Sequence, residues 1–104
     1  MNCKTLKEFQ AKIDEWIASH GGYWPPLSMV VSIMEELGEI AREINHLEGF
    51  KPKKASEVPS SLGEELADLM FSIICLANHY KIDLTAYLNN VIKKYDKRDK
   101  NRFI

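Results

Sequence analysis

Glu35-Glu36-Leu37-Gly38-Glu39 and Glu64-Glu65-Leu66-Ala67-Asp68 are two nearly identical pentads in one short chain. Each pentad lies in a stretch whose apolar residues recur every three or four positions, which is the periodicity of an amphipathic helix. Carboxylates three residues apart lie on one side of such a helix. If the two helices pack antiparallel, their carboxylates can converge. The pentads therefore predict a helix pair that shares an acidic site.

The angular positions of the residues select which carboxylates converge. At about 100° per residue, the apolar stripe of each helix is predicted from the apolar residues that share one side. These residues are Ile33, Leu37, Ile40 and Ile44 in the first helix, and Leu62, Leu66, Met70, Ile73 and Ala77 in the second. Glu35 lies opposite the first stripe, and Glu64 is predicted to complete a capping box with Ser61. The converging set is then Glu36, Glu39, Glu65 and Asp68.

A cation would relieve the repulsion among these four carboxylates. No Lys or Arg lies between Leu62 and Tyr80, and a buried carboxylate without a partner is costly. Oxygen ligands favour Mg²⁺ or Mn²⁺ over zinc. A partner chain could also neutralise the site, and two solvated helix faces are the alternative, because glutamate is a good helix former.

The rest of the chain predicts an all-α fold. Helices are expected at about 5–19, 27–47 and 61–80, with a fourth that starts after Asp83 as its N-cap. A loop is predicted at 49–59, and no convincing strand appears. Residues 1–104 are read as one domain, a four-helix bundle with a basic tail at about 93–104. Its surplus apolar surface predicts that a homo-oligomer completes the core.

Composition excludes several classes of protein. A net charge of −1 gives no reason to expect binding to nucleic acid. The longest wholly apolar stretch, Ile73–Ala77, is too short to span a membrane, and no signal peptide is recognisable. Cys3 and Cys75 are not predicted to form a disulfide, which suits a reducing cytoplasm.

Two basic segments could bind polyphosphate opposite a metal ion. The first contains Lys51, Lys53 and Lys54, and the second closes the chain with Lys93, Lys94, Lys97, Arg98, Lys100 and Arg102. A solubilising charged end is the alternative interpretation of the second segment.

The two acidic motifs resemble those of the all-α nucleotide pyrophosphohydrolases of the MazG type. Their pattern of E-E-x-x-E followed by E-x-x-D is present at 35–39 and 65–68. The string at 36–46, the Lys-Pro-Lys-Lys string at 51–54, Leu76-Ala77-Asn78 and the tail at 94–100 are similar to the short, single-domain YpjD-like group. The resemblance covers most of residues 5–103.

The resemblance implies Mg²⁺-dependent hydrolysis of a nucleoside triphosphate between its α and β phosphorus atoms. Glu36, Glu39, Glu65 and Asp68 match the family's metal ligands, and Glu35 or Glu39 would be the general base. Lys54, Lys94 and Arg98 are the predicted phosphate contacts. The family forms dimers or dimers of dimers with the active site near the subunit interface. Substrates range from abnormal nucleotides, in housecleaning, to specific pyrimidine nucleotides.

Recognition of the base is predicted from the remaining aromatic, amide and basic residues. Candidates for stacking are Tyr23, Trp24 and Phe50, candidates for reading the base edge are Asn45 and Asn78, and Lys51 and Lys53 are further substrate contacts. For Trp24, which precedes Pro25, packing in the core is preferred to stacking on a base. His20, His46 and His79 lack metal-ligand spacing and are predicted to be surface or hydrogen-bonded structural residues.

Three other functions compete with this interpretation. Phosphoribosyl-ATP pyrophosphohydrolase belongs to the same superfamily. A non-catalytic helical module would bind a nucleotide or a protein without turnover. DNA binding is disfavoured, because the basic residues lie in a loop and a tail rather than on a recognition helix.

Overall fold

The computed structural model describes residues 3–49 and 61–99, which form four α-helices and no strand. The helices are α1 (Leu6–Ala18), α2 (Pro26–Leu47), α3 (Leu62–His79) and α4 (Leu84–Asp99). The predicted all-α class is therefore confirmed, and the predicted ends of the first three helices agree within one or two residues. The predicted 49–59 loop, apart from Gly49, and the last five residues of the tail lie outside the described residues.

Side-chain caps begin three of the helices where the sequence predicted them. Thr5 and Glu8 form a complete capping box, with both hydrogen bonds 3.1 Å long. These bonds to Thr5 lower the pKa of the Glu8 carboxyl. Ser61 Oγ accepts a 3.0 Å bond from the Glu64 N–H at the start of α3. Asp83 Oδ1 accepts 3.0 Å and 3.4 Å bonds from the two N–H groups that follow Leu84.

The ends of α1 and α3 use the same left-handed backbone turn. Gly21 has φ +97° at the end of α1, and the Gly22 N–H donates to the Ile17 carbonyl at 2.9 Å. At the end of α3, Lys81 takes φ +57° and the Ile82 N–H donates to the Ala77 carbonyl at 2.9 Å. Glycine adopts such a φ freely, whereas lysine at Lys81 does so at a steric cost.

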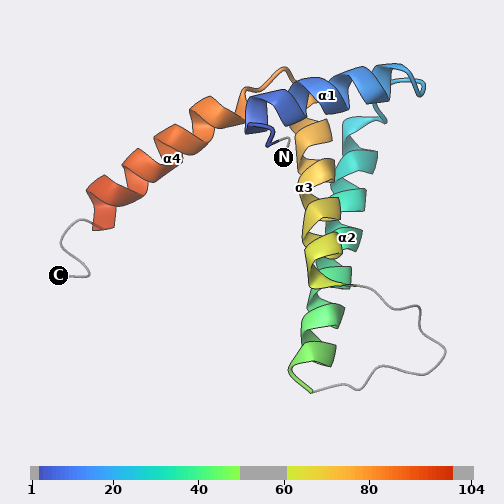
Figure 1. Cartoon of the computed structure of the whole chain (residues 1–104), viewed down its shortest axis with the longest axis vertical. Helices are drawn as coiled ribbons and strands as arrows, with labels where there is room; N and C mark the ends of the chain where they lie inside the picture. The colour runs from blue at the N-terminus through green and yellow to red at the C-terminus, as the bar shows by residue number, and fades with distance from the viewer. Residues whose placement is uncertain (1–2, 50–60, 100–104) are drawn as a thin grey trace.

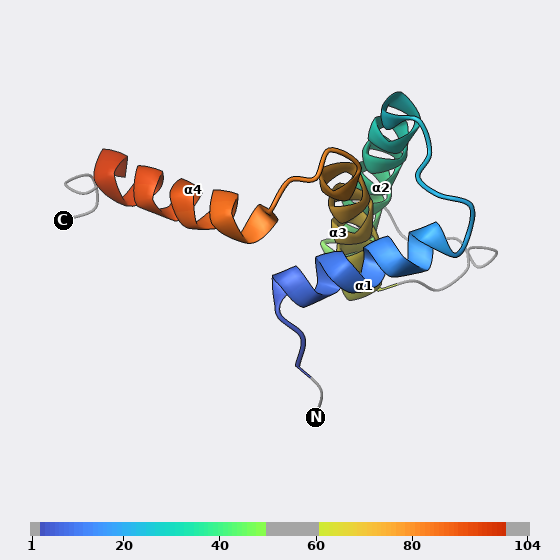
Figure 2. The same ribbon diagram turned by 90° about the horizontal axis from the view of Figure 1, so that it is seen from above.

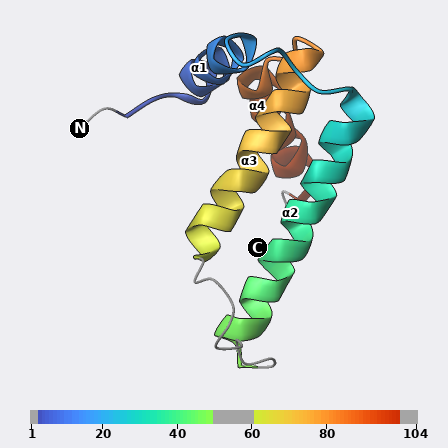
Figure 3. The ribbon, with the colours of Figure 1, turned by 90° about the vertical axis from the view of Figure 1, so that its right-hand side faces the viewer.

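The helices α2 and α3 lie side by side and run in opposite directions (Figures 1 and 3). The helix α1 crosses the end of this pair and packs mainly on α3 (Figures 1 and 2). The helix α4 extends away from the α2–α3 pair, and its packing contacts are mainly with α1 (Figure 2). None of the described helices has the combination of length and hydropathy that a membrane span requires.

The apolar stripes predicted for α2 and α3 are buried only in part. Leu37 and Met70, near the centres of the two stripes, are 58% and 56% exposed. One residue of each stripe is buried, Ile40 on α2 and Ala77 on α3. The other buried side chains lie outside the stripes: Met29 and Glu43 on α2, and Ile74 and Cys75 on α3. The helices are rotated so that their acidic sides meet, which buries Glu43 to 7% exposure. The predicted buried side is therefore confirmed at Ile40 and Ala77 and wrong at Leu37, Ile44, Leu66, Met70 and Ile73. An amphipathic pattern does not say which partner covers the apolar side.

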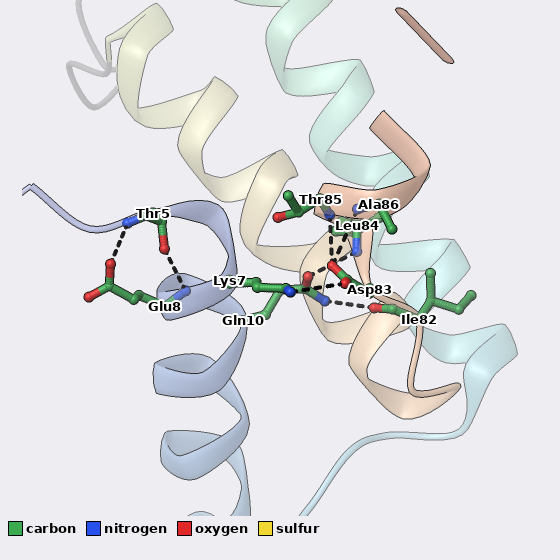
Figure 4. Close-up of polar contacts among 9 residues, drawn as sticks. All are labelled: Thr5, Lys7, Glu8, Gln10, Ile82, Asp83, Leu84, Thr85 and Ala86. Atoms are coloured by element: carbon green, nitrogen blue, oxygen red, sulfur yellow. Dashed lines mark hydrogen bonds and ion pairs between the residues drawn. The ribbon is translucent and has the colours of Figure 1, made fainter. Parts of the chain in front are cut away.

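A buried amide joins the start of α4 to α1 and α3. Gln10, 8% exposed, donates 2.9 Å bonds from Nε2 to Asn78 Oδ1 and to the Ile82 carbonyl. Its Oε1 accepts a 3.0 Å bond from the Leu84 N–H, and Lys7 lies 3.4 Å from the Asp83 carboxylate beside it (Figure 4). The bond to Asn78 holds α1 on α3, and the other three contacts involve Ile82, Asp83 and Leu84. This polar network therefore sets the direction in which α4 leaves the other helices.

Candidate active site

Three carboxylates converge between α2 and α3. Glu36 projects from α2, and Glu65 and Asp68 project from α3 three residues apart. One carboxylate oxygen of each residue lies within 4.8 Å of one oxygen of each of the others. Glu36 and Glu65 are half-buried and Asp68 is exposed, so the group opens to solvent. The structure therefore brings together three of the four predicted metal ligands, and we call them the acidic cluster.

Mutual repulsion and burial perturb two members of the acidic cluster. Burial, followed by the nearby charges of Asp68 and Glu65, raises the pKa of the Glu36 carboxyl. Burial, followed by the charges of Glu39 and Asp68, likewise raises the pKa of Glu65. A cation held by these oxygens would remove the repulsion. Three carboxylates with solvent access form the donor set of a hard divalent ion such as Mg²⁺ or Mn²⁺, so the residues present fit such an ion.

The fourth predicted ligand, Glu39, does not belong to the cluster of three. Its side chain is exposed, yet its charge contributes to the raised pKa values of Glu36 and Glu65. Glu35 is also exposed, and its charge affects Glu36 alone among the cluster. Glu43, to which the sequence analysis gave no role, is buried one turn beyond Glu39 and adds to the negative field at Glu65.

An aromatic cavity lies beside the acidic cluster, between α1, α2 and α3. Its volume is about 420 Å³, and its aromatic walls are Trp16, His20, Tyr23, Trp24 and Phe71. Trp24 is 65% exposed, so it is a wall of this cavity and its preferred interpretation as a core residue was wrong. The sequence analysis missed Trp16, His20 and Phe71 as cavity residues, because they come from two distant parts of the chain that only the packing of α1 on α3 brings together.

Several contacts hold these aromatic walls in place. Trp16 stacks on His20 with ring centroids 4.0 Å apart and meets the edge of Phe71 at 6.0 Å. The Tyr23 hydroxyl donates a 2.6 Å bond to Asp14, which ties the α1–α2 connection to α1. Burial and this bond raise the pKa of Tyr23 to about 12. The cavity therefore has a prearranged aromatic lining.

Helical spacing relates the cavity to the acidic cluster. Ser32 and Ser72 line the cavity, and they lie four residues before Glu36 on α2 and four residues after Asp68 on α3. Because the two helices are antiparallel, both serines are displaced from the cluster in the same direction, by one turn or about 6 Å. The cavity and the cluster are thus consecutive compartments along one helix pair.

The two thiols of the described chain are free. Cys3 is exposed, and Cys75 is buried at the wall of the cavity. Burial raises the pKa of the Cys75 thiol, which disfavours the thiolate that nucleophilic catalysis needs.

The two amides predicted to read a base lie elsewhere. Asn78 Oδ1 accepts from Gln10, and its Nδ2 donates a 2.9 Å bond to the Gln10 carbonyl, so the amide is used to join α1 and α3. Asn45 is exposed near the end of α2 and is not part of the cavity wall. Phe50, Lys51, Lys53 and Lys54 lie outside the described residues.

The two predicted phosphate contacts on α4 do not reach the cluster within one chain. Lys94 and Arg98 lie over the Tyr95 ring, at 5.2 Å and 4.6 Å from its centroid. Arg98 also pairs with Asp99 at 2.9 Å, which raises the pKa of the guanidinium. Since α4 extends away from the α2–α3 pair in Figures 1 and 2, these cations are separated from the carboxylates of their own chain.

The histidines do not form a metal site with the carboxylates of the cluster. His20 Nδ1 lies 2.7 Å from the Trp16 carbonyl and 2.9 Å from Ser19 Oγ. His79 contacts the edges of Tyr23 and Tyr80, with centroids 6.2 Å and 4.9 Å apart. His20 also lines the aromatic cavity, a position that the sequence analysis did not predict.

Comparison with known proteins gives these features a family context. A model of the MazG nucleotide pyrophosphohydrolase domain matches residues 25–103, which include both acidic motifs. The uncharacterized protein YpjD of Bacillus subtilis (strain 168) is 45% identical over 104 residues, covering 99% of this chain and 94% of YpjD.

Two crystal structures have the same fold. That of YpjD from Bacillus subtilis matches 92% of this chain and 99% of its own, with a TM-score of 0.81 and 44% identity. That of the Bacillus-conserved MazG protein, a nucleotide pyrophosphohydrolase, matches 97% of this chain and 99% of its own, with a TM-score of 0.80 and 40% identity. The four-helix chain with its paired acidic motifs belongs to the MazG family of nucleotide pyrophosphohydrolases.

Proposed function

We propose that this protein hydrolyses nucleoside triphosphates between the α and β phosphorus atoms, releasing a nucleoside monophosphate and pyrophosphate. The observation that carries the proposal is the position of three converging carboxylates one helical turn from an aromatic cavity. The cluster suits the charged end of a nucleotide through a divalent cation, and the cavity suits the base. A membership in the pyrophosphohydrolase family supports the same reaction class.

Glu36, Glu65 and Asp68 are the residues that would hold the cation, which we propose to be Mg²⁺, with Mn²⁺ as a substitute. When bound, the ion would offset the charge of the phosphates and lower the pKa of a nearby water. The helices α2 and α3 hold the three carboxylates close together before any ligand binds. Burial, followed by the charges of the neighbouring carboxylates, raises the pKa values of Glu36 and Glu65, and the same charges would attract the ion.

The aromatic cavity is the proposed site for the base. Trp24 offers an exposed ring face on the cavity wall, and Trp16 is held by its contacts with His20 and Phe71. Stacking of a base on an aromatic side chain contributes about 1–3 kcal/mol and tolerates different bases. A cavity of this kind is consistent with housecleaning of a mixed nucleotide pool in the cytoplasm.

Glu39 is the better placed of the two predicted general bases. Its charge influences carboxylates on both helices, Glu36 and Glu65, whereas Glu35 influences Glu36 alone. Glu39 is also exposed and outside the cluster of three, so its carboxylate oxygens remain available to accept a proton from the attacking water.

A second copy of the chain is proposed to cover the outer side of the α2–α3 pair, in a homodimer or a dimer of dimers. Four large apolar side chains are exposed on these two helices, those of Leu37, Ile44, Leu66 and Met70. Since α4 leads Lys94 and Arg98 away from the carboxylates of their own chain, any role of these cations at the phosphates would have to be exercised on a neighbouring copy. Lys54 remains a proposed phosphate contact.

The identity of the products tests the proposed reaction. The purified chain would be incubated with Mg²⁺ and a panel of canonical and damaged ribo- and deoxyribonucleoside triphosphates, with pyrophosphate and orthophosphate measured separately. We expect monophosphate and pyrophosphate in equal amounts, abolished by EDTA. Orthophosphate and a diphosphate would contradict cleavage at the α–β bond. Binding without turnover of any nucleotide would indicate a binding module, and turnover of phosphoribosyl-ATP alone would indicate the histidine-pathway activity.

A further inference from the structure

Two serines lie at the boundary between the acidic cluster and the aromatic cavity. Ser32 on α2 and Ser72 on α3 both line the cavity and are half-buried. Each lies four residues from a carboxylate of the cluster, Ser32 from Glu36 and Ser72 from Asp68. Since residues four apart share one side of a helix, the serines continue the acidic sides of both helices toward the aromatic walls.

These are the hydroxyl groups of the cavity wall that have no hydrogen-bond partner among the described residues. The Tyr23 hydroxyl is used by Asp14 at 2.6 Å, and His20 Nδ1 is used by the Trp16 carbonyl at 2.7 Å. Within residues 3–49 and 61–99, neither Ser32 nor Ser72 has a hydrogen bond from its hydroxyl. Each hydroxyl has one donor and two acceptor positions, so a ligand at this level can both donate to it and accept from it.

The position of the serines matches one part of a nucleotide. In a nucleoside triphosphate the furanose lies between the base and the α-phosphate. The serines are one turn, about 6 Å, from the carboxylates, a length comparable with a furanose ring and its 5′-methylene group. A base among the aromatic walls and phosphates near the cluster would therefore bring the sugar to the level of Ser32 and Ser72.

We propose that Ser32 and Ser72 bind the sugar hydroxyls and that this pair lets the enzyme accept ribonucleotides. Serine is the smallest hydroxylated side chain, so the pair offers hydrogen bonds to a 2′-hydroxyl without filling its space. This inference rests on the proposed function and specifies its substrate class, nucleoside 5′-triphosphates that carry ribose.

Paired substrates test the inference. For the base that the wild type hydrolyses fastest, kcat/KM would be measured for the ribo, 2′-deoxy and 3′-deoxy triphosphates with wild type, Ser32→Ala, Ser72→Ala and the double variant. A neutral hydrogen bond contributes about 0.5–1.5 kcal/mol, so each single substitution should lower the ribonucleotide value by about 2- to 12-fold. The value for the triphosphate that lacks the contacted hydroxyl should change less than twofold, so the ratio of the two values moves.

Controls separate this inference from the proposed function. Ser28→Ala, at an exposed position on α2 outside the cavity wall, should leave all values unchanged. If the wild type hydrolyses ribo and deoxyribo substrates but neither serine substitution moves their ratio, the sugar assignment is wrong and the proposed function stands. Hydrolysis of deoxyribonucleotides alone would also contradict the assignment. If the wild type hydrolyses no triphosphate, both fail. Thermal melting of each variant would show that it remains folded.

Discussion

The inner and outer sides of the α2–α3 pair both depart from the usual amphipathic helix, because carboxylates join the buried apolar residues on the inner side and large apolar residues stay exposed on the outer side. The inner side places Glu36 against Glu65 and Asp68, and it buries Glu43. The outer side exposes large apolar residues such as Leu37 and Met70. Bringing carboxylates together costs free energy, and exposing apolar residues forgoes the gain of burying them. Such an arrangement is stable when a cation joins the inner side and another surface covers the outer one.

The largest effect is expected from substitutions in the acidic cluster. Glu36→Gln and Asp68→Asn keep the shape of each side chain but remove a charged ligand from the inner side. We expect kcat/KM to fall by at least about a hundredfold, as for loss of an electrostatic group that stabilises a transition state. Glu15→Gln, at an exposed position on α1, is the control and should keep full activity. Values within about threefold of the wild type for both variants would show that the cluster is not the catalytic centre.

The polar network at Gln10 is expected to have the next largest effect, on stability. Gln10→Leu removes three side-chain hydrogen bonds and leaves Asn78 and the Ile82 carbonyl without this partner. The free energy of unfolding should fall by about 2–3 kcal/mol, because buried polar groups would lose their bonds. Urea unfolding followed by circular dichroism measures it. Asn45→Leu replaces an exposed amide and should change stability little; equal effects of the two substitutions would contradict a special role for Gln10.

Substitution of Trp24 tests whether the aromatic cavity binds the base. Trp24→Ala should raise KM by about 5- to 150-fold, corresponding to 1–3 kcal/mol of lost stacking, with a much smaller change in kcat. Trp24→Phe keeps an aromatic ring, so its KM should lie between those of the wild type and Trp24→Ala. Steady-state kinetics on the best substrate gives both values. A loss confined to kcat would contradict a role in binding the base.

The pH dependence of stability tests the repulsion within the cluster directly. Glu36 and Glu65 have pKa values raised above the 4.5 of an ordinary glutamate, so the unfolded chain loses these protons at lower pH than the folded chain does. Their favourable contribution to folding is complete below pH 4.5 and is lost as the pH rises through the raised values. In EDTA, urea unfolding should therefore show a steeper loss of stability with rising pH for the wild type than for Glu36→Gln. Parallel curves would mean that neither burial nor repulsion raises the pKa of Glu36 in the folded chain.

The smallest change in the free energy of unfolding is expected for a substitution on the outer side of the α2–α3 pair. Met70→Gln alters an exposed residue, so the free energy of unfolding of an isolated chain should change by about 0.5 kcal/mol or less. Sedimentation velocity should nevertheless show weaker self-association than in the wild type. Lys12→Gln, on the exposed part of α1, is the control. An unchanged association constant for Met70→Gln would place the subunit interface elsewhere.

Local signals predicted most of the fold. Thr5, Ser61 and Asp83 bind the N–H groups that begin three helices, and such caps depend on residues only two or three positions away. The rotation of α2 and α3 could not be predicted in the same way. Leu37 and Met70 mark an apolar side in each helix, but the sequence does not say whether α2, α3 or a second copy covers that side.

The candidate site could also be predicted only where local spacing along one helix determines it. Glu36, Glu65 and Asp68 were identified because carboxylates three residues apart share a helix side, and the structure brings them together. The aromatic cavity joins Trp16 to Phe71, 55 residues later in the chain, and no local pattern connects such distant residues. Asn78 was predicted to bind the base because its amide could read a base edge. In the structure both polar atoms of this amide are hydrogen-bonded to Gln10.

Anomalous diffraction from crystals soaked with Mn²⁺ tests the central claim most directly, that the inner side of the α2–α3 pair holds a divalent cation. Data would be collected above the manganese absorption edge, with and without a non-hydrolysable nucleoside triphosphate. The account predicts an anomalous peak within coordination distance of the Glu36, Glu65 and Asp68 carboxylates, and its absence in the Glu36→Gln, Asp68→Asn double variant. No peak among these three residues at saturating Mn²⁺ and nucleotide would contradict it.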